Sequence, residues 1–267
     1  MSTRAPQPSD PPRLTVSLGS GHAAYTDEGR GPVIVAVHGL PGSARDFRHL
    51  APHLARCARV IRIDLPGFGE TPAATEPDPS PEGRARFVLS TIDALDLEPP
   101  TLLGHSMGGV VACAAAVAAP PGRLARLALL SSPGLRPHTM LRRLPFRTMN
   151  TLLSLPLLGP ALTPALRALF RSSGFRGYPD GELLRTITCV THTSIARHAD
   201  NVRRVALPTL VAWCEDDPLI ERDIAHELAA ALPDGPRLRF SKGGHNPQKS
   251  QAVSIAETLC GWLATSS

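Results

Sequence analysis

The chain has 267 residues, a length that suits one large α/β domain or one core domain with a small insertion. Hydrophobic residues make up 42% of the chain and charged residues 19%, so a sizeable core can form and a disordered chain is excluded. The net charge is +5, but the basic residues lack interleaved aromatic side chains, which argues against a nucleic-acid partner.

The N-terminal segment 1–13 is rich in Pro and Ser and has no apolar stretch of the kind found in a signal peptide. We predict a disordered tail there. The longest uncharged stretch, 148–166, is interrupted by three prolines and a glycine. Such a stretch makes a poor membrane-spanning helix, so no transmembrane segment is expected.

The cysteines are odd in number, scattered, and without CxxC spacing. This pattern argues against a disulfide framework and against a zinc site, and we expect isolated buried thiols in a reducing, cytoplasmic compartment. No cofactor or metal is expected either, because no nucleotide-binding glycine pattern and no histidine pair with metal-ligand spacing occurs in the right context. The cysteines are Cys57, Cys113, Cys189, Cys214 and Cys260.

Short apolar runs alternate with longer helical patterns along most of the chain. Such alternation predicts a mostly parallel central sheet with helices on both faces, and the nearly continuous apolar character of the strands fits burial on both sides. The predicted strands are 33–37, 60–64, 101–103, 127–130, 209–213 and 238–240, and the predicted helices are 44–56, 84–95, 107–119, 223–232 and 250–263.

The region 134–207 interrupts this alternation. It has no clear strand, is helix-prone, and contains several Pro and Gly residues. We predict a helical cap there, inserted into a core formed by residues 14–133 and 208–267. The cap is expected to lie over the C-terminal edge of the sheet, where open α/β sheets bind their ligands.

The strongest chemical signal is the sequence GHSMG at 104–108, which follows a predicted strand and opens a predicted helix. This is G-x-S-x-G in the strand–turn–helix setting that exposes a nucleophilic serine, here Ser106. Gly104 and Gly108 are expected because side chains at these positions would collide in so sharp a turn. The alternative is a glycine-rich turn with an incidental serine.

Companion residues argue against that alternative. A serine nucleophile needs a base, and the base needs a carboxylate that orients it. Asp216 and Asp217 follow one predicted strand and His245 follows the next, in the order Ser, Asp, His. All of these residues therefore lie at C-terminal strand ends, the same edge as Ser106.

With these motifs the chain resembles the α/β-hydrolase superfamily, specifically the capped branch with a serine nucleophile. The resemblance extends from about Val33 to Leu263 and implies the α/β-hydrolase fold with a helical cap insertion. It implies that Ser106 is the nucleophile and His245 the base. The matching motifs are HGLPG at 38–42, DLPGFG at 64–69, GHSMGG at 104–109, EDDPLI at 215–220 and GGH at 243–245.

The resemblance also suggests the acid of the triad. The family usually has a glycine three positions before that acid, and here Cys214 stands in place of the glycine. Counting three residues on from Cys214 gives Asp217, which we prefer. The departure from the family pattern at Cys214 keeps Asp216 as the alternative.

The same resemblance implies an oxyanion hole formed by the backbone N–H groups of Leu40 and Met107. His38 and Gly39 precede Leu40, and we expect His38 to brace this loop by hydrogen bonds without transferring protons. His105 is expected to contribute packing beside the nucleophile.

The predicted reaction is hydrolysis of a carboxylic ester through an acyl-enzyme. Hydrolytic C–C cleavage of a β-diketone-like substrate and cofactor-free perhydrolase activity use the same triad and are the alternatives. A non-catalytic binding protein of this fold is a further alternative, although it would not need all three triad residues. The serine at position 106 argues against epoxide hydrolase and haloalkane dehalogenase chemistry, in which an aspartate forms the alkyl ester.

The predicted cap combines leucines with basic charge. Eleven arginines and three acidic residues give residues 134–207 a balance of +8, which leaves −3 for the remainder. In one interpretation the leucines pack the cap onto the core and the arginines face water. In the other, the leucines line an acyl pocket and the arginines attract an anionic substrate or an anionic membrane surface. The leucines are Leu152, Leu153, Leu155, Leu157, Leu158, Leu162, Leu166 and Leu169.

Overall fold

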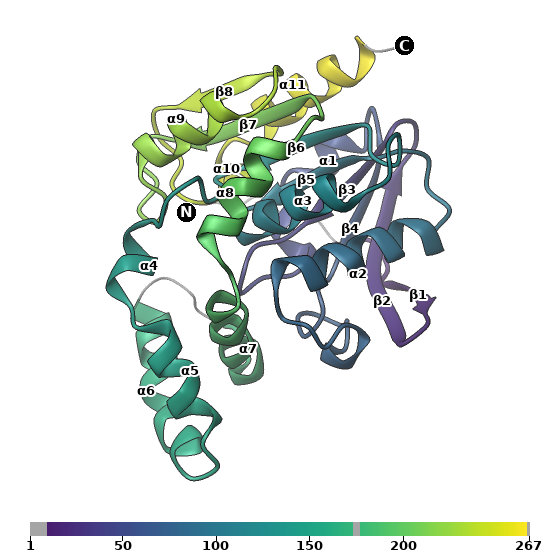
Figure 1. The fold of residues 1–267 in the computed structure, drawn as a ribbon. Coiled ribbons are helices and arrows are strands. Elements are labelled where there is room, and N and C mark those ends of the chain that lie inside the picture. The colour runs from purple at the N-terminus through teal and green to yellow at the C-terminus, as the bar shows by residue number, and fades with distance from the viewer. Residues whose placement is uncertain (1–9, 173–176, 266–267) are drawn as a thin grey trace, which may run out of the picture.

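One eight-stranded sheet runs through the protein in the order β1-β2-β4-β3-β5-β6-β7-β8 (Figure 1). The structure is a computed structural model that describes residues 10–172 and 177–265. Strands β3 to β8 are parallel, whereas β1 and β2 pair antiparallel, so the predicted mostly parallel sheet is confirmed. The strands are β1 (Leu14–Leu18), β2 (Gly21–Gly29), β3 (Val33–Val37), β4 (Arg59–Ile63), β5 (Thr101–His105), β6 (Arg126–Leu130), β7 (Thr209–Cys214) and β8 (Arg237–Phe240).

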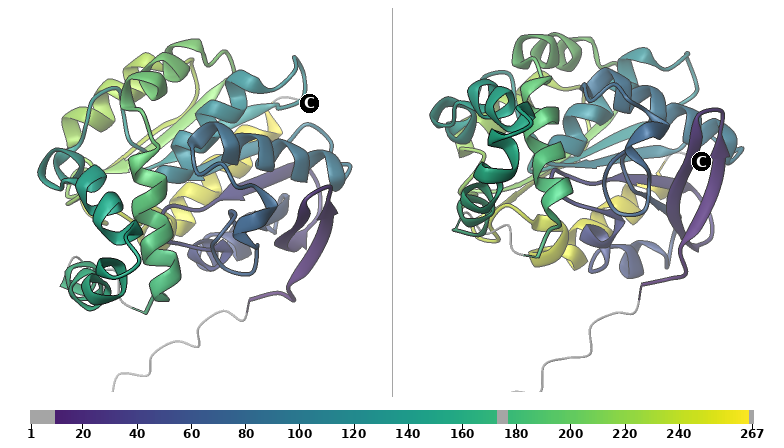
Figure 2. Two further views of the ribbon diagram at one scale, coloured as in Figure 1. Left: turned by 60° about the horizontal axis from the view of Figure 1, so that its bottom comes forward. Right: turned by 90° about the horizontal axis from the view of Figure 1, so that it is seen from below.

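Helices cover both faces of this sheet, as Figure 2 shows. Adjacent strand residues contribute to different cores, because successive side chains of a strand point to opposite faces. Val35 packs into the cluster on one face and Ile34 into the cluster on the other. The first face carries α2 (Pro81–Ala94), α3 (Met107–Ala118), α8 (Ile195–Arg204) and α9 (Arg222–Ala231), and the second carries η1 (Ala44–Phe47), α1 (Ala51–Leu54) and α11 (Ala252–Ala264).

The antiparallel strands β1 and β2 were not expected from the sequence. Strand β2 contains the charged residues Asp27 and Glu28. Charged residues are uncommon in strands, so the sequence of β2 lacks the apolar pattern by which strands are recognised. Both charges are matched by the neighbouring strand β4. The Asp27 carboxylate accepts from the Arg59 guanidinium at 2.7 Å, and Glu28 lies 2.9 Å from the guanidinium of the buried Arg62.

Two predicted helices are shorter than the sequence pattern suggested. The predicted helix 44–56 is divided into the 3₁₀ helix η1 and the short helix α1. The predicted helix 250–263 corresponds to α11, which the short helix α10 (Pro247–Ser250) precedes. A further 3₁₀ helix, η2 (Ala73–Thr75), lies in the loop between β4 and α2.

The predicted disordered tail was wrong for residues 10–13, while residues 1–9 lie outside the described residues. Asp10 forms ion pairs with Arg62 at 3.1 Å and with Arg45 at 3.3 Å. Arg13 reaches the fully buried carboxylate of Asp64 at 3.0 Å. These ion pairs attach the segment to the core beside β4.

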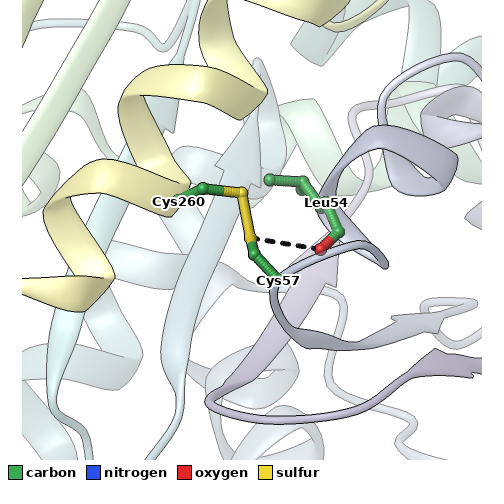
Figure 3. Close-up of a disulfide and its surroundings, with 3 residues drawn as sticks. All are labelled: Leu54, Cys57 and Cys260. Carbon is green, nitrogen blue, oxygen red and sulfur yellow. Dashed lines mark hydrogen bonds between the residues drawn. A yellow bond between two sulfur atoms is a disulfide. The ribbon is translucent and has the colours of Figure 1, made fainter.

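The prediction of isolated thiols was wrong for two of the five cysteines. Cys57, which follows α1, forms a disulfide with Cys260 of α11, and Figure 3 shows the bond joining the two segments. Their Cα atoms are 5.9 Å apart although 203 positions separate them in sequence. The pairing follows from the packing of α1 against α11, which no local cysteine spacing could reveal. Cys113, Cys189 and Cys214 are buried free thiols.

The described part of the segment between β6 and β7 contains helices and loops but no strand, and its first four helices form a separate layer (Figure 1). Helices α5, α6 and α7 share their own apolar cluster, which includes Phe146, Leu166 and Ile187. Val202 of α8 belongs instead to the main core cluster. We therefore propose that the cap proper comprises α4 (Thr139–Arg143), α5 (Phe146–Ser154), α6 (Leu158–Ser172) and α7 (Asp180–Thr191).

No helix in residues 10–172 or 177–265 is long and apolar enough to cross a membrane.

Candidate active site

Ser106 stands at the sharp turn between β5 and α3. Its backbone has φ 52° and ψ −125°, a conformation that is strained for a residue with a side chain. A Cβ at Gly104 would lie 2.6 Å from the Gly108 carbonyl oxygen. A Cβ at Gly108 would lie 2.2 Å from the Val37 carbonyl oxygen. Both glycines are therefore required by close backbone packing, which holds the serine side chain out of the turn.

Three predicted residues lie in one hydrogen-bonded chain. The Nε2 atom of His245 is 2.8 Å from Oγ of Ser106, and its Nδ1 atom is 2.9 Å from Oδ2 of Asp217. The Asp217 side chain is almost fully buried, while that of His245 retains about a tenth of its exposed surface. The serine hydroxyl can donate to His245, and the opposite ring nitrogen can donate to the carboxylate.

The two neighbouring aspartates occupy different environments. Oδ1 of Asp217 also accepts from the amides of Leu219 at 2.8 Å and Ile220 at 3.0 Å. Burial alone would raise the pKa of Asp217, but these hydrogen bonds and the one from His245 bring it below its ordinary value. Asp216 points elsewhere, and its Oδ1 accepts from the Gly244 amide at 2.8 Å.

Cys214, the departure from the family pattern, fits this loop without displacing Asp217. The Asp217 amide donates to the Cys214 carbonyl at 3.2 Å, which closes the turn at the end of β7. The Cys214 thiol lies against Gly243, where an added Cβ would be 2.6 Å from the sulfur. A side chain at 214 is therefore accommodated because position 243 has none.

The predicted oxyanion-hole residues both line the cavity beside Ser106. Met107 is the first residue of α3, so its N–H is one of the unpaired amides of a helix N-terminus. Within the described residues, neither the Met107 nor the Leu40 amide has a hydrogen-bond partner. At Gly39 an added Cβ would lie 3.0 Å from Cβ of Ser106, so glycine allows the two segments to approach each other.

His38 is fully buried below this loop. Its Nδ1 atom donates to the Gly39 carbonyl at 2.6 Å, and its Nε2 atom accepts from the Leu65 amide at 2.9 Å. Burial lowers the pKa of His38 to about 4, so the ring is neutral at pH 7. One neutral tautomer satisfies both contacts, and the ring fixes the position of the loop that precedes Leu40.

His105 makes a contact that its sequence position did not reveal. Its Nε2 atom donates to the His245 backbone carbonyl at 2.8 Å. Burial lowers the pKa of His105 to about 3, so this ring is neutral as well. The hydrogen bond links the residue before the nucleophile directly to the loop that carries His245.

A cavity of about 380 Å³ opens onto Ser106 and lies between the core and the cap. Its cap wall consists mainly of apolar side chains from α4, α5 and α6. Among the described residues, no Lys or Arg lines the cavity, and no group of His, Cys, Asp or Glu is arranged to hold a metal ion. The apolar wall residues include Met140, Leu141, Leu144, Phe146, Met149 and Phe170.

Sequence reasoning missed several polar residues of this cavity, among them His138 and Asp46. His138 precedes α4, and burial lowers its pKa to about 4. Burial also raises the pKa of the Asp46 carboxyl to about 7. His138 belongs to no motif, and Asp46 is readable from the sequence only as the N3 residue of the capping box that Ser43 begins, because the folded chain alone brings both to the cavity.

Most of the cap leucines neither pack the cap onto the core nor line the cavity. Leu169 lines the cavity and Leu166 is buried inside the cap, but five other leucines are exposed at the far end of the α5–α6 hairpin. The arginines divide as well. Within the described residues five are paired with acids, namely Arg136, Arg142, Arg167, Arg197 and Arg204, whereas the side chain of Arg171 and all of Arg176 lie outside the described part.

Comparison with known proteins identifies relatives of the same fold. Residues 32–154 match the family described as alpha/beta hydrolase fold. The uncharacterized hydrolase YugF of Bacillus subtilis is 24% identical over 90% of this chain and 92% of its own length. A 2-hydroxy-6-oxononadienedioate/2-hydroxy-6-oxononatrienedioate hydrolase of Cupriavidus pinatubonensis is 25% identical over 89% of each chain.

The fold is also found in solved structures. The meta-cleavage product hydrolase CumD of Pseudomonas fluorescens superimposes with a TM-score of 0.73 over 95% of this chain and 98% of its own, at 20% identity. The sheet order, the turn at Ser106 and these similarities together show that the chain has the α/β-hydrolase fold.

Proposed function

We propose that the protein hydrolyses carboxylic esters whose acyl part is uncharged and apolar. The carrying observation is the hydrogen-bonded chain Ser106–His245–Asp217 at the floor of a cavity with an apolar cap wall. Such a chain activates a serine hydroxyl, and an apolar cavity favours an acyl chain that leaves water.

The reaction begins when Oγ of Ser106 attacks the ester carbonyl and Nε2 of His245 takes the hydroxyl proton. The Asp217 carboxylate stabilises the imidazolium that forms, and the amides of Leu40 and Met107 donate to the oxyanion. When the tetrahedral intermediate collapses, His245 returns the proton to the departing alcohol. A water molecule, deprotonated by His245, then hydrolyses the acyl-enzyme and regenerates the serine hydroxyl.

Hydrolytic C–C cleavage is the second candidate, because the Cupriavidus pinatubonensis relative is named a hydrolase of a 2-hydroxy-6-oxo acid, which is a ketone and not an ester. The name of that relative's substrate specifies a dioate, which carries two carboxylates. A buried carboxylate requires a cationic or hydrogen-bonding partner. Since no Lys or Arg lines the described part of the cavity, a carboxylate there would have only neutral donors such as Tyr178, Thr186 and Asn246, and we rank ester hydrolysis first.

The test is a panel of p-nitrophenyl esters from acetate to decanoate, measured beside a 2-hydroxy-6-oxodienoate. We expect kcat/KM to rise with acyl length until the cavity is filled and then to fall, with little turnover of the dienoate. A fluorophosphonate probe should label the wild type but not Ser106→Ala. Faster turnover of the dienoate than of every ester would favour C–C cleavage, and absence of both turnover and labelling would favour a non-catalytic protein.

A further inference from the structure

The far end of the α5–α6 hairpin exposes a group of leucines, which we call the leucine tip. The most exposed is Leu157, at 88%, in the connection between the two helices. Outside this group, the exposed large apolar side chains of the described chain are Leu14, Leu169 and Val253. Single exposed leucines are common on folded proteins, but a concentrated group marks an interaction surface. The leucine tip comprises Leu152, Leu155, Leu157, Leu158 and Leu162.

The leucine tip lies beyond the part of the hairpin that packs inside the cap. Phe146 of α5 and Leu166 of α6 form that packing, together with Ile187 of α7. Leu158 and Leu162 lie two turns and one turn before Leu166 along the same side of α6, yet both are exposed. The packing inside the cap therefore covers this side of α6 at Leu166 and leaves it uncovered toward the tip. In Figure 1 the hairpin extends away from the sheet, so the core does not cover the tip.

The leucine tip itself is uncharged, and the nearest basic residues stand at the base of the hairpin. No Asp, Glu, Lys or Arg occurs from Thr148 to Leu166, so the tip can leave water without burying a charge. Arg143 and Arg147 stand at the base of the hairpin, both exposed and without an ion pair among the described residues. Arg147 lies five residues before Leu152, about 7.5 Å along the helix axis. The sequence has no acidic residue between Gly134 and Pro179.

We propose that the leucine tip inserts into the surface of an anionic membrane while Arg143 and Arg147 contact the lipid headgroups. Interfacial apolar segments enter the headgroup and acyl boundary by about 5–10 Å, which matches the spacing between Arg147 and the tip. Anionic lipid complements the exposed arginines. A second copy of this chain fits less well as the partner. Symmetric pairing of two leucine tips would bring Arg143 and Arg147 of both copies close together, and their like charges would repel.

This proposal does not depend on the reaction that the site performs, and it is tested without substrate. The full chain is floated with vesicles of phosphatidylcholine alone and of phosphatidylcholine with 30 mol% phosphatidylglycerol. We expect binding to the anionic vesicles that weakens as salt increases, because the Debye length is only about 10 Å at 0.1 M. Equal binding to both vesicle types, or none to either, overturns the proposal.

Matched variants assign the binding to the tip. Leu157→Ser/Leu158→Ser should lower the partition coefficient at least about tenfold, whereas Leu14→Ser/Val253→Ser removes exposed apolar side chains of the core and should not. Arg143→Gln/Arg147→Gln should lower it about 25-fold, about fivefold for each arginine. Arg30→Gln/Arg56→Gln, at exposed core positions, is the charge control.

Two outcomes would contradict the assignment. Equal losses in the tip variants and in their core controls would show that binding is not local to the hairpin. A dimer in sedimentation analysis that the leucine variant dissociates, without vesicle binding by the wild type, would identify a second copy as the partner. Thermal unfolding of every variant verifies that the fold is retained.

Discussion

The core and the cap of this protein are built on different physical principles. In the core, Ser106 is fixed by backbone geometry, since the turn around Gly104 and Gly108 tolerates no side chain, and hydrogen bonds with Asp217 and His105 hold His245. In the cap, the cavity wall consists of apolar side chains that share no motif with one another. The core therefore holds its site residues through a few specific backbone positions and hydrogen bonds, while the cap supplies shape and surface through many interchangeable side chains.

The sharpest test of the core is Ser106→Ala. Removing the nucleophile should lower kcat for a p-nitrophenyl ester by about 10⁵–10⁶, because His245 and Asp217 act only through the serine. The unfolding transition should be unchanged, since the alanine keeps the Cβ and loses only a hydroxyl. Ser254→Ala, at an exposed position of α11, is the control and should keep full activity. A Ser106→Ala protein with more than about one per cent of wild-type kcat would move the chemistry to another residue.

The two adjacent aspartates should differ sharply. Asp217→Asn should lower kcat about 10⁴-fold, because an amide cannot stabilise the imidazolium and favours the wrong tautomer of His245. Asp216→Asn should lower kcat by less than about tenfold, since the Asp216 carboxylate accepts from backbone amides of this loop, among them that of Gly244, and not from the His245 ring. Steady-state kinetics of both variants with the same ester measure the difference. A larger loss in Asp216→Asn would reverse the assignment.

The sequence predicted the parts of the protein that depend on local backbone rules. The turn at Ser106 requires glycines at fixed offsets, and the parallel strands are continuous apolar runs, so both are visible in the sequence. Strand β2 was missed because Asp27 and Glu28 are neutralised by arginines that lie far away along the chain. The Cys57–Cys260 pairing was missed for the same reason, since it depends on two helices meeting across the fold.

In the cap, the sequence predicted the helices but not which leucines are buried. The helical character of the cap was predictable from composition, but the side each leucine faces depends on how α5, α6 and α7 pack together. Leu166 is buried in that packing while Leu162, one turn away, is exposed. A leucine-rich segment therefore predicted apolar surface without saying whether the protein itself covers it.

The disulfide should stabilise the core without affecting the cap. Cys57→Ser/Cys260→Ser should lower the free energy of unfolding by about 2–4 kcal/mol, measured by urea denaturation, because the bond restricts the unfolded chain. A reductant should lower the stability of the wild type by a similar amount and leave the double variant unchanged. KM for an apolar ester should be the same in both proteins, since neither cysteine lines the cavity.

A thiol assay gives an independent control for that prediction. The denatured, non-reduced wild type should show three reactive thiols, those of Cys113, Cys189 and Cys214, and all five should react after reduction. Five reactive thiols before reduction would contradict the disulfide.

The smallest expected effect concerns Asp46, at the boundary between core and cap. Burial raises the pKa of this carboxyl to about 7, while the Ser43 amide and Arg48 act in the opposite direction and Asp64 and Glu182 add to the rise. The carboxyl is therefore neutral below about pH 7 and becomes charged above it. An apolar acyl chain removes water from the cavity, which disfavours the charged form, so KM should increase on the alkaline side.

Asp46→Asn isolates this effect, because asparagine has a similar shape, can still accept from the Ser43 amide and does not ionise. The ratio of kcat/KM for the variant to that of the wild type should rise about three- to tenfold between pH 6 and pH 8.5 with a long-chain ester, the amount expected if substrate raises the Asp46 pKa by about 0.5–1 unit. Any pH dependence that the two proteins share cancels in this ratio. Glu98→Gln, an exposed acid outside the cavity, should give a flat ratio. A flat ratio for Asp46→Asn as well would show that the cavity tolerates a carboxylate beside the acyl chain, and the ranking of neutral apolar esters over charged substrates would then lose its physical basis.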